Sequence, residues 1–167
     1  MKKIFVMGSL NMDISINTDI FPKEGETVIG NGFITNPGGK GANQAVAAAR
    51  QDAKVFMLGA VGNDLYGKEL IENLKNNKVN TKYVLKKDAS SGVAVIIVQK
   101  GKNRIILSSG ANYKYDFEDY KEVLKTNANA GDYFITQMET RLDNVIEGIK
   151  LAKSLDMQVV LNPAPAK

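Results

Sequence analysis

The residues best suited to bind a small molecule lie in Gly38–Arg50, which reads Gly-Gly-Lys-Gly-Ala-Asn-Gln-Ala-Val-Ala-Ala-Ala-Arg. Its glycines carry no Cβ, so the backbone there can approach a ligand closely. A helix is predicted to begin within the segment, and its unpaired N–H groups and positive dipole end would face the same point. Lys40 adds a cation, and Asn43 adds an amide that both donates and accepts hydrogen bonds. The segment is therefore predicted to hold a polar or anionic small molecule.

Two common nucleotide-binding motifs are excluded for this segment. A P-loop needs a glycine five residues before its Gly-Lys pair and a serine or threonine after it, but Ile34 and Gly41 occupy those positions. A dinucleotide fingerprint would need glycine or alanine at position 44, where Gln44 stands. A glycine turn that only starts a packed helix is the alternative interpretation. Asn43 and Gln44, so early in a helix of small residues, favour ligand contact.

Asn11 and Asp13 lie just beyond the first predicted strand, at the edge where open α/β sheets bind ligands. In an extended chain, residues two apart project to the same side. A carboxylate beside an amide can then bind two neighbouring hydroxyl groups, because the carboxylate accepts and the amide does both. An Asx turn at the end of the strand is the alternative. The presence of the glycine-rich segment favours the binding interpretation.

Glu139 follows another predicted strand, residues 133–137, and the run Asn162-Pro-Ala-Pro-Ala166 follows a further one. The alternative role for Glu139 is a charge that stabilises the N-terminus of the next helix. Because parallel strands end at one edge of a sheet, Glu139 is expected to reach the same cleft as Asn11 and Asp13. The prolines predict a rigid loop at that edge, since they continue neither a ladder nor a helix.

The elements that must position these residues alternate along the chain. Helices are predicted at residues 42–51, 65–77, 116–125 and 142–154, with Asp64 and Asp116 as caps and with Leu65, Leu70, Ile71 and Leu74 on one apolar face. Apolar strands are predicted at residues 3–8, 13–20, 27–30, 33–35, 54–62, 79–85, 93–99, 104–108, 133–137 and 157–161. This alternation predicts an α/β fold with a doubly wound, mainly parallel sheet. The strands at about 14–36 and 93–108 have no crossover helices between them and predict a separate, small antiparallel sheet.

Composition narrows the chemistry. The 167 residues include no cysteine and no histidine, which excludes disulfides, thiolate metal sites and histidine bases. The net charge is +4, but the lysines are scattered without interleaved aromatic residues, so no nucleic-acid partner is expected. The apolar stretch near the N-terminus is too short for a signal peptide or a membrane span. A one-domain, cytoplasmic protein with no membrane partner is therefore expected.

Seven segments together resemble the ribokinase family of carbohydrate and nucleoside kinases, in the family's order and from Ile4 to Ala166. They are Gly8-Ser-Leu-Asn-Met-Asp13, Pro22-Lys-Glu-Gly-Glu-Thr-Val28, Gly38–Arg50, Ser91-Gly-Val-Ala-Val95, Gly110-Ala-Asn112, Gln137-Met-Glu139 and Asn162–Ala166. The third and last are closest in form to the ribose-specific members. The resemblance implies sugar contacts at Asn11, Met12, Asp13, Gly39, Lys40, Gly41, Ala42, Asn43 and Glu139.

The same resemblance implies a role for the small sheet. It would be the family's lid over the sugar, with Ala94, Ile96 and Leu107 against the sugar ring. In the family the lids of two subunits clasp, which implies a homo-oligomer, formed through the lid or through a face that a second half would cover.

The chain also departs from the family, whose members are nearly twice as long. Their second half carries an Asn-x-x-Glu motif for magnesium and phosphate, and a Gly-Ala-Gly-Asp motif that supplies the catalytic base. Neither motif is found here, so no catalytic residue is assigned. The full-length enzymes are expected to convert D-ribose to ribose 5-phosphate with Mg-ATP and a monovalent cation such as potassium. This chain is expected to be their N-terminal half, to bind none of these cofactors well and to be inactive alone.

Several alternatives stay open. Within the kinase class the substrate could be deoxyribose, another pentose or a nucleoside, because Asn11 and Asp13 recognise hydroxyl pairs rather than a whole molecule. A stand-alone sugar-binding or regulatory module would bind the sugar without turnover. A dinucleotide-binding oxidoreductase is disfavoured, because the fingerprint glycine is missing.

Overall fold

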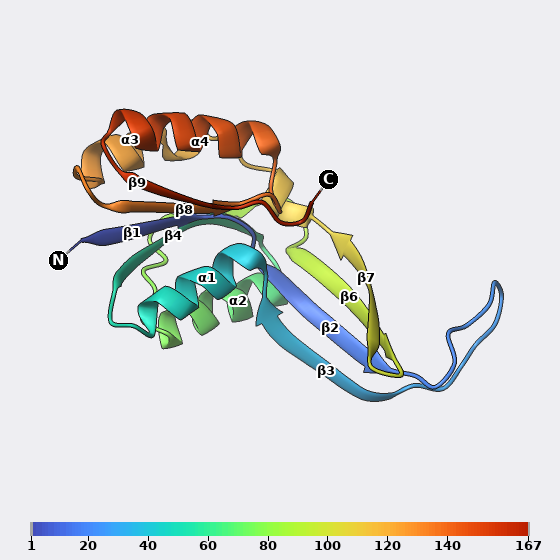
Figure 1. The fold of residues 1–167 in the computed structure, drawn as a ribbon. Coiled ribbons are helices and arrows are strands. Elements are labelled where there is room, and N and C mark those ends of the chain that lie inside the picture. The colour runs from blue at the N-terminus through green and yellow to red at the C-terminus, as the bar shows by residue number, and fades with distance from the viewer. Residues whose placement is uncertain (1, 167) are drawn as a thin grey trace.

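A computed structural model describes residues 2–166 and shows two sheets that meet at an angle (Figure 1). The large sheet is parallel throughout and has the strand order β5-β4-β1-β8-β9. Its strands are β1 (Lys3–Met7), β4 (Lys54–Gly62), β5 (Val84–Lys87), β8 (Tyr133–Gln137) and β9 (Gln158–Asn162). The predicted parallel sheet is confirmed.

Helices cover both faces of the large sheet, as the doubly wound prediction requires (Figure 1). They are α1 (Lys40–Ala49), α2 (Leu65–Asn76), α3 (Glu118–Asn127) and α4 (Leu142–Ser154), with a short 3-10 helix, η1 (Gly110–Tyr113). One apolar core, which includes Phe5 and Phe134, lies beneath α3 and α4. The other, which includes Ala45, Met57 and Leu70, lies beneath α1 and α2.

The small sheet has the strand order β3-β2-β6-β7. Its strands are β2 (Asn11–Asn17), β3 (Asn31–Gly38), β6 (Gly92–Gln99) and β7 (Lys102–Ser108). The pairs β2–β3 and β6–β7 are antiparallel as predicted, but β2 and β6 are parallel, so the sheet is mixed. The reason is that β2 follows β1 and β6 follows β5, so both leave the same edge of the large sheet in one direction.

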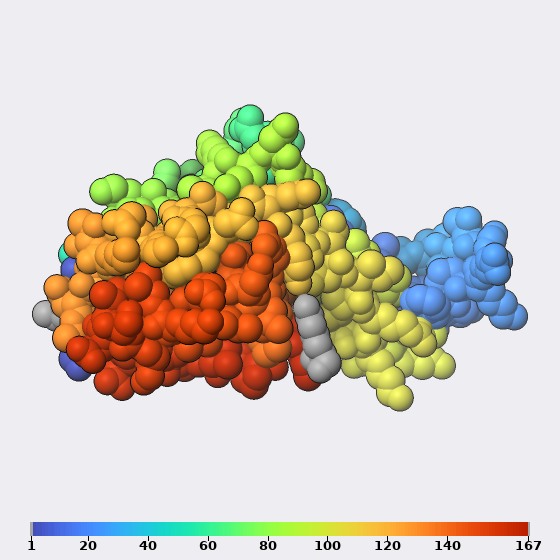
Figure 2. All heavy atoms as spheres, turned by 90° about the horizontal axis from the view of Figure 1, so that it is seen from above, coloured from blue at the N-terminus to red at the C-terminus, as the bar shows by residue number. Residues whose placement is uncertain are grey.

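The segment between β2 and β3 projects beyond the rest of the molecule (blue in Figure 2). The sequence predicts strands at residues 27–30 and 33–35, whereas the structure forms one strand, β3, and leaves 27–30 outside it. Ile29 is 96% exposed. β2 ends at Asn17, so beyond that point no neighbouring strand is available to pair with residues 27–30.

Three other local predictions are corrected. Residues 79–83 precede β5 and contribute a single bridge, between Asn80 and Phe56. Asp116 is not the cap of α3, whose N-cap is Phe117; its carboxylate instead pairs with Arg141. Leu65 is exposed, because it directly follows the cap and its side chain lies outside the packed face of α2. The cap Asp64 is confirmed, since its carboxylate accepts the N–H of Gly67.

Candidate functional site

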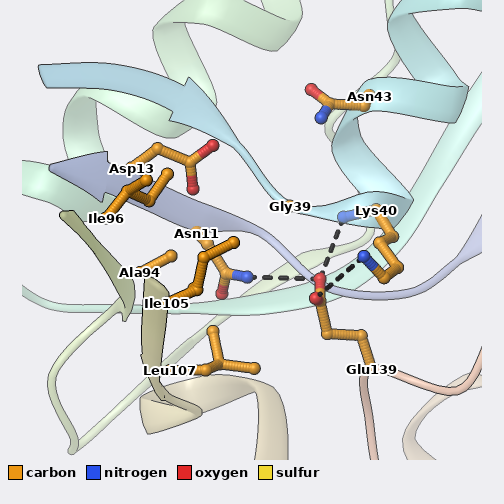
Figure 3. A pocket seen from close by; sticks show the side chains of 10 residues that line it. All are labelled: Asn11, Asp13, Gly39, Lys40, Asn43, Ala94, Ile96, Ile105, Leu107 and Glu139. Atoms are coloured by element: carbon orange, nitrogen blue, oxygen red, sulfur yellow. Dashed lines mark hydrogen bonds and ion pairs between the residues drawn. The ribbon is translucent and has the colours of Figure 1, made fainter. Parts of the chain in front are cut away.

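A cavity of about 150 Å³ lies where the small sheet meets the end of the large sheet (Figure 3). Its lining residues come from strands of the small sheet, from the start of α1 and from the loop after β8. They are Asn11, Asp13, Gly39, Lys40, Asn43, Ala94, Ile96, Ile105, Leu107 and Glu139. The predicted convergence of separate strand ends on one cleft is therefore what the structure shows.

Glu139 is the centre of the polar half of the cavity (Figure 3). Its Oε2 accepts hydrogen bonds from Ser9 Oγ at 2.5 Å, from Asn11 Nδ2 at 3.2 Å and from the backbone N–H of Lys40 at 3.0 Å. Its Oε1 lies 3.5 Å from Lys40 Nζ. The carboxylate also sits at the N-terminus of α1, where a negative charge is favourable. Glu139 thus joins the loop after β8, the start of β2 and the start of α1 in one network.

Glycines allow this close approach. Gly39 has φ +91°, and a Cβ there would lie 2.7 Å from the backbone nitrogen of Asn11. A Cβ at Gly41 would lie 2.6 Å from the carbonyl carbon of Gly8. The first turn of α1 therefore packs directly on the backbone of residues 8–11, which is what brings the Lys40 N–H within reach of Glu139.

Asp13 is the second carboxylate of the cavity and lies on the same side of β2 as Asn11 (Figure 3). Burial raises the pKa of the Asp13 carboxyl above its usual value, the nearby Glu139 carboxylate raises this pKa further, and Lys40 lowers it. The cavity therefore holds two carboxylates and one ammonium group. That balance favours a neutral molecule with hydroxyl groups and disfavours an anion. Of the two ligand classes that the sequence predicts, polar and anionic, the cavity therefore fits the polar one.

The other half of the cavity is apolar and comes from the hairpin β6–β7. Ala94 pairs with Leu107 and Ile96 pairs with Ile105, so these four side chains share one face of the small sheet. Ile105 was not among the predicted contacts. The signal was present, because two-residue alternation from Leu107 and pairing with Ile96 both point to it.

Most of the predicted contacts line the cavity, but Met12, Gly41 and Ala42 do not. Met12 projects to the face of β2 opposite Asn11 and Asp13 and is buried in the core beneath α1. Ala42 belongs to the same core, and Gly41 is covered by Gly8. Adjacency in a motif therefore did not mean contact with the cavity for these three residues.

Two polar residues behind the cavity were also missed. Ser9 donates to Glu139 and accepts the N–H of Gly41 at 3.4 Å. Asn112 hydrogen-bonds to Leu10 and Asn11. Periodicity gives no signal for either role, since the partners of Ser9 and Asn112 lie far away in the chain.

The residues around the cavity do not fit a metal site. Within residues 2–166 no three or more His, Cys, Asp or Glu residues gather where they could hold a metal ion. Glu139 Oε2 already accepts three hydrogen bonds, and Lys40 adds a positive charge.

Within residues 2–166 no helix is long and apolar enough to cross a membrane.

Comparison with known proteins gives concordant matches. The family model for pfkB family carbohydrate kinases matches residues 1–167. Ribokinase from Bacillus subtilis is 44% identical over 172 residues, which cover 100% of this chain and 57% of the relative. Deoxyribokinase from Salmonella typhi is 41% identical over 165 residues, which cover 98% and 54%. The chain thus spans about half the length of these relatives.

A solved structure shows the same fold. Ribokinase from Arabidopsis thaliana, complexed with ribose and ATP, superposes with a TM-score of 0.84 at 31% identity. The match covers 98% of this chain and 54% of that one.

Proposed function

This chain belongs to the pfkB family of carbohydrate kinases, and we propose that its cavity binds the sugar substrate of a ribokinase-type enzyme, D-ribose or a similar pentose. The observation that carries the proposal is the network around Glu139, which gathers hydrogen-bond donors and acceptors opposite an apolar wall. A sugar has the matching surfaces, because its hydroxyl groups donate and accept while its C–H groups are apolar.

The charges favour an unphosphorylated sugar. Asp13 and Glu139 can accept hydrogen bonds from hydroxyl groups, and Asn11 and Lys40 can donate to them. A sugar phosphate would bring its own negative charges beside two carboxylates that face one lysine, so it is expected to be repelled.

The size favours a single ring. Pockets for drug-sized ligands enclose about 300–1,000 Å³, whereas this cavity encloses about 150 Å³. A pentose is therefore favoured over a nucleoside. The relatives include both a ribokinase and a deoxyribokinase, so D-ribose and 2-deoxyribose are the two sugars to compare.

In the complete enzyme the reaction would be transfer of the ATP γ-phosphoryl group to the sugar hydroxyl. Phosphoryl transfer depends mostly on positioning and on electrostatic stabilisation of the transferred group. The described residues would contribute the first: Asn11, Asp13, Lys40 and Glu139 hold and orient the sugar. The family's motifs for the nucleotide and the catalytic base do not occur in this chain, so we propose that it does not phosphorylate the sugar alone.

A stand-alone sugar-binding module is the second candidate. It is favoured by the Glu139 network, because the residues that form these hydrogen bonds all lie within residues 2–166. Such a module would bind sugar without turnover.

Two measurements test these proposals on the 167-residue chain. Titration calorimetry should show binding of D-ribose and no comparable binding of ribose 5-phosphate. A coupled assay with D-ribose and MgATP should show no turnover. Absence of D-ribose binding would refute the proposed site, and measurable turnover by the purified chain would refute its inactivity.

We also propose that the chain self-associates. Apolar side chains are exposed on the small sheet, among them Phe33 and Ile106, and on β9, where Val160 and Leu161 lie. β9 ends the order of the large sheet, so its outer edge has no strand partner within the described residues, which favours association. Light scattering should show an oligomer, and comparing Ile106→Asp with Val160→Asp identifies the surface. A monomer at high protein concentration would refute the proposal.

A further inference from the structure

Asn112 lies in η1, behind the cavity and outside its lining, and is 1% exposed. It is the polar residue of the Gly110-Ala-Asn112 segment, to which the proposed function gives no role. We infer that Asn112 is a positioning residue, which fixes the side-chain amide of Asn11 so that a hydrogen-bond donor faces the sugar. The inference rests on the proposed function and adds to it that Asn11 presents a hydrogen-bond donor, rather than an acceptor, to the sugar.

The orientation of Asn112 is set by backbone groups. Its Oδ1 accepts the N–H of Leu10 at 2.9 Å, and its Nδ2 donates to the carbonyl of Leu10 at 3.0 Å. A backbone N–H can only donate and a carbonyl can only accept, so a flipped Asn112 amide would lose both bonds. Because Asn112 is buried, that loss would leave polar groups unsatisfied.

This orientation passes to Asn11. Asn112 Nδ2 also donates to Asn11 Oδ1 at 2.8 Å, which holds the oxygen of Asn11 away from Glu139. The nitrogen of Asn11 consequently donates to Glu139 Oε2 at 3.2 Å, on the side that lines the cavity (Figure 3). A hydroxyl group at this point must accept from Asn11 and direct its own hydrogen to a carboxylate, either Asp13 or Glu139.

The surroundings leave little room for another arrangement. A Cβ on Gly92 would lie 2.1 Å from Asn11 Oδ1 and 2.3 Å from Asn112 Nδ2, so the first residue of β6 closes over this contact. The N–H of Ala111 donates to the carbonyl of Ser90 at 2.8 Å and fixes η1 beside it. The side-chain amides of Asn11 and Asn112 are therefore held in place by the start of β6 and by η1.

The test is a double-mutant cycle on D-ribose binding, measured by calorimetry. Asn112→Asp keeps the acceptor for Leu10 but replaces the donor with an oxygen that faces Asn11 Oδ1. We expect D-ribose affinity to fall about tenfold or more, because Asn11 is driven to turn its oxygen toward Glu139. In an Asn11→Ala background, Asn112→Asp should cause no further loss.

Asn144→Asp is the matched control. Asn144 is also buried, accepts the N–H of Phe117 at 2.9 Å and donates to the carbonyl of Tyr115 at 2.9 Å, but it does not line the cavity. Both Asp variants should lower the melting temperature, whereas only Asn112→Asp should weaken D-ribose binding. Equal loss of binding in both variants, or the same loss from Asn112→Asp with and without Asn11, would overturn the inference.

A second readout needs no ligand. The side-chain amide resonances of Asn11, assigned by NMR through their loss in Asn11→Ala, should shift in Asn112→Asp or in the milder Asn112→Ser and stay in place in Asn144→Asp. Resonances that do not respond to position 112 would overturn the inference even if D-ribose binds. If D-ribose does not bind the unmodified chain but the resonances shift as expected, the proposed function fails and the positioning of Asn11 stands.

Discussion

The two walls of the cavity are built in opposite ways. On the polar wall, Asn11 is 2% exposed and the side chain of Glu139 is 10% exposed, and both are held by hydrogen bonds. On the apolar wall, Ile105 is 55% exposed and Leu107 is 39% exposed, although their positions on the small sheet are fixed by pairing with β6. One wall is packed into the body of the protein, and the other stands at its surface.

This difference separates two contributions to binding. In the proposed sugar site, the polar wall is organised before a ligand arrives, so it would select a hydroxyl arrangement without a large ordering penalty. The apolar wall contributes when a ligand or another surface covers it, at about 25 cal/mol for each Å² of apolar surface removed from water. Substitutions in the polar wall should therefore change both stability and ligand recognition, whereas substitutions in the apolar wall should change ligand affinity alone.

The largest expected effect is on stability, from Gly39→Ala in the polar wall. The new Cβ combines a positive φ with contact to the backbone of Asn11, so the free energy of unfolding should fall by about 2–5 kcal/mol. Gly101→Ala, in the β6–β7 turn, has φ +75° but nothing within 4 Å of the Cβ. It should cost about 1–2 kcal/mol in a denaturant titration. Equal losses of unfolding free energy in Gly39→Ala and Gly101→Ala would show that the contact with the Asn11 backbone adds nothing to the cost of the positive φ.

Glu139→Gln should reduce D-ribose affinity about 10- to 100-fold, since a hydrogen bond to a charged group contributes about 1.5–3 kcal/mol. Calorimetry measures this effect, with Glu147→Gln as the control. Glu147 lies on α4 in an exposed pair with Lys150 and does not line the cavity. Unchanged affinity in Glu139→Gln would remove the polar wall from recognition.

Ile105→Ser should reduce D-ribose affinity about three- to tenfold while leaving the unfolding transition almost unchanged, because the side chain is already half exposed. Ile106→Ser is the matched control, since Ile106 is the next residue, is 69% exposed and points to the opposite face of the small sheet. The same loss of affinity in both variants would show that the apolar wall acts through the whole hairpin rather than through its cavity face.

The smallest effect is expected from Asp13→Asn on the stability of the unliganded protein. Because the pKa of Asp13 is raised by burial and by Glu139, its ionised form is less favourable in the folded than in the unfolded chain. The folded state therefore binds the proton more strongly, and this destabilisation grows as the pH rises through the raised pKa. Asp13→Asn should be more stable by less than about 1 kcal/mol at pH 7, since the group is partly exposed to solvent.

Urea titrations at several pH values measure that difference. The gain from Asp13→Asn should shrink as the pH is lowered and should be lost below the ordinary pKa of an aspartate, where the wild-type carboxyl is protonated in both states. A gain that stays constant with pH would contradict the assignment of the effect to ionisation. D-ribose binding should weaken in the same variant, because the carboxylate acceptor is lost.

The sequence predicted the large sheet more successfully than the small one. β4, β8 and α4 lie where the sequence places them, because continuous apolar strands and amphipathic helices each leave a local pattern. The small sheet was predicted as antiparallel throughout and with extra pairing at residues 27–30. The sheet is mixed because β2 and β6, which are distant in the sequence, leave the large sheet at the same edge and pair in parallel. The local sequence pattern of each strand does not indicate this.

The site follows the same division. The residue types and the predicted strand ends were enough to predict that one group of side chains lies together: Asn11, Asp13, Lys40, Asn43 and Glu139. Side-chain chemistry can be read from the sequence, and so can the strand ends that form one edge of a parallel sheet. Only the tertiary structure decided that Met12 and Ala42 turn into the core, and that Ser9 and Asn112 hydrogen-bond to Glu139 and Asn11 from behind the cavity. Hydrogen bonds between residues about one hundred positions apart arise from packing, and packing is set by the whole chain rather than by any one segment of it.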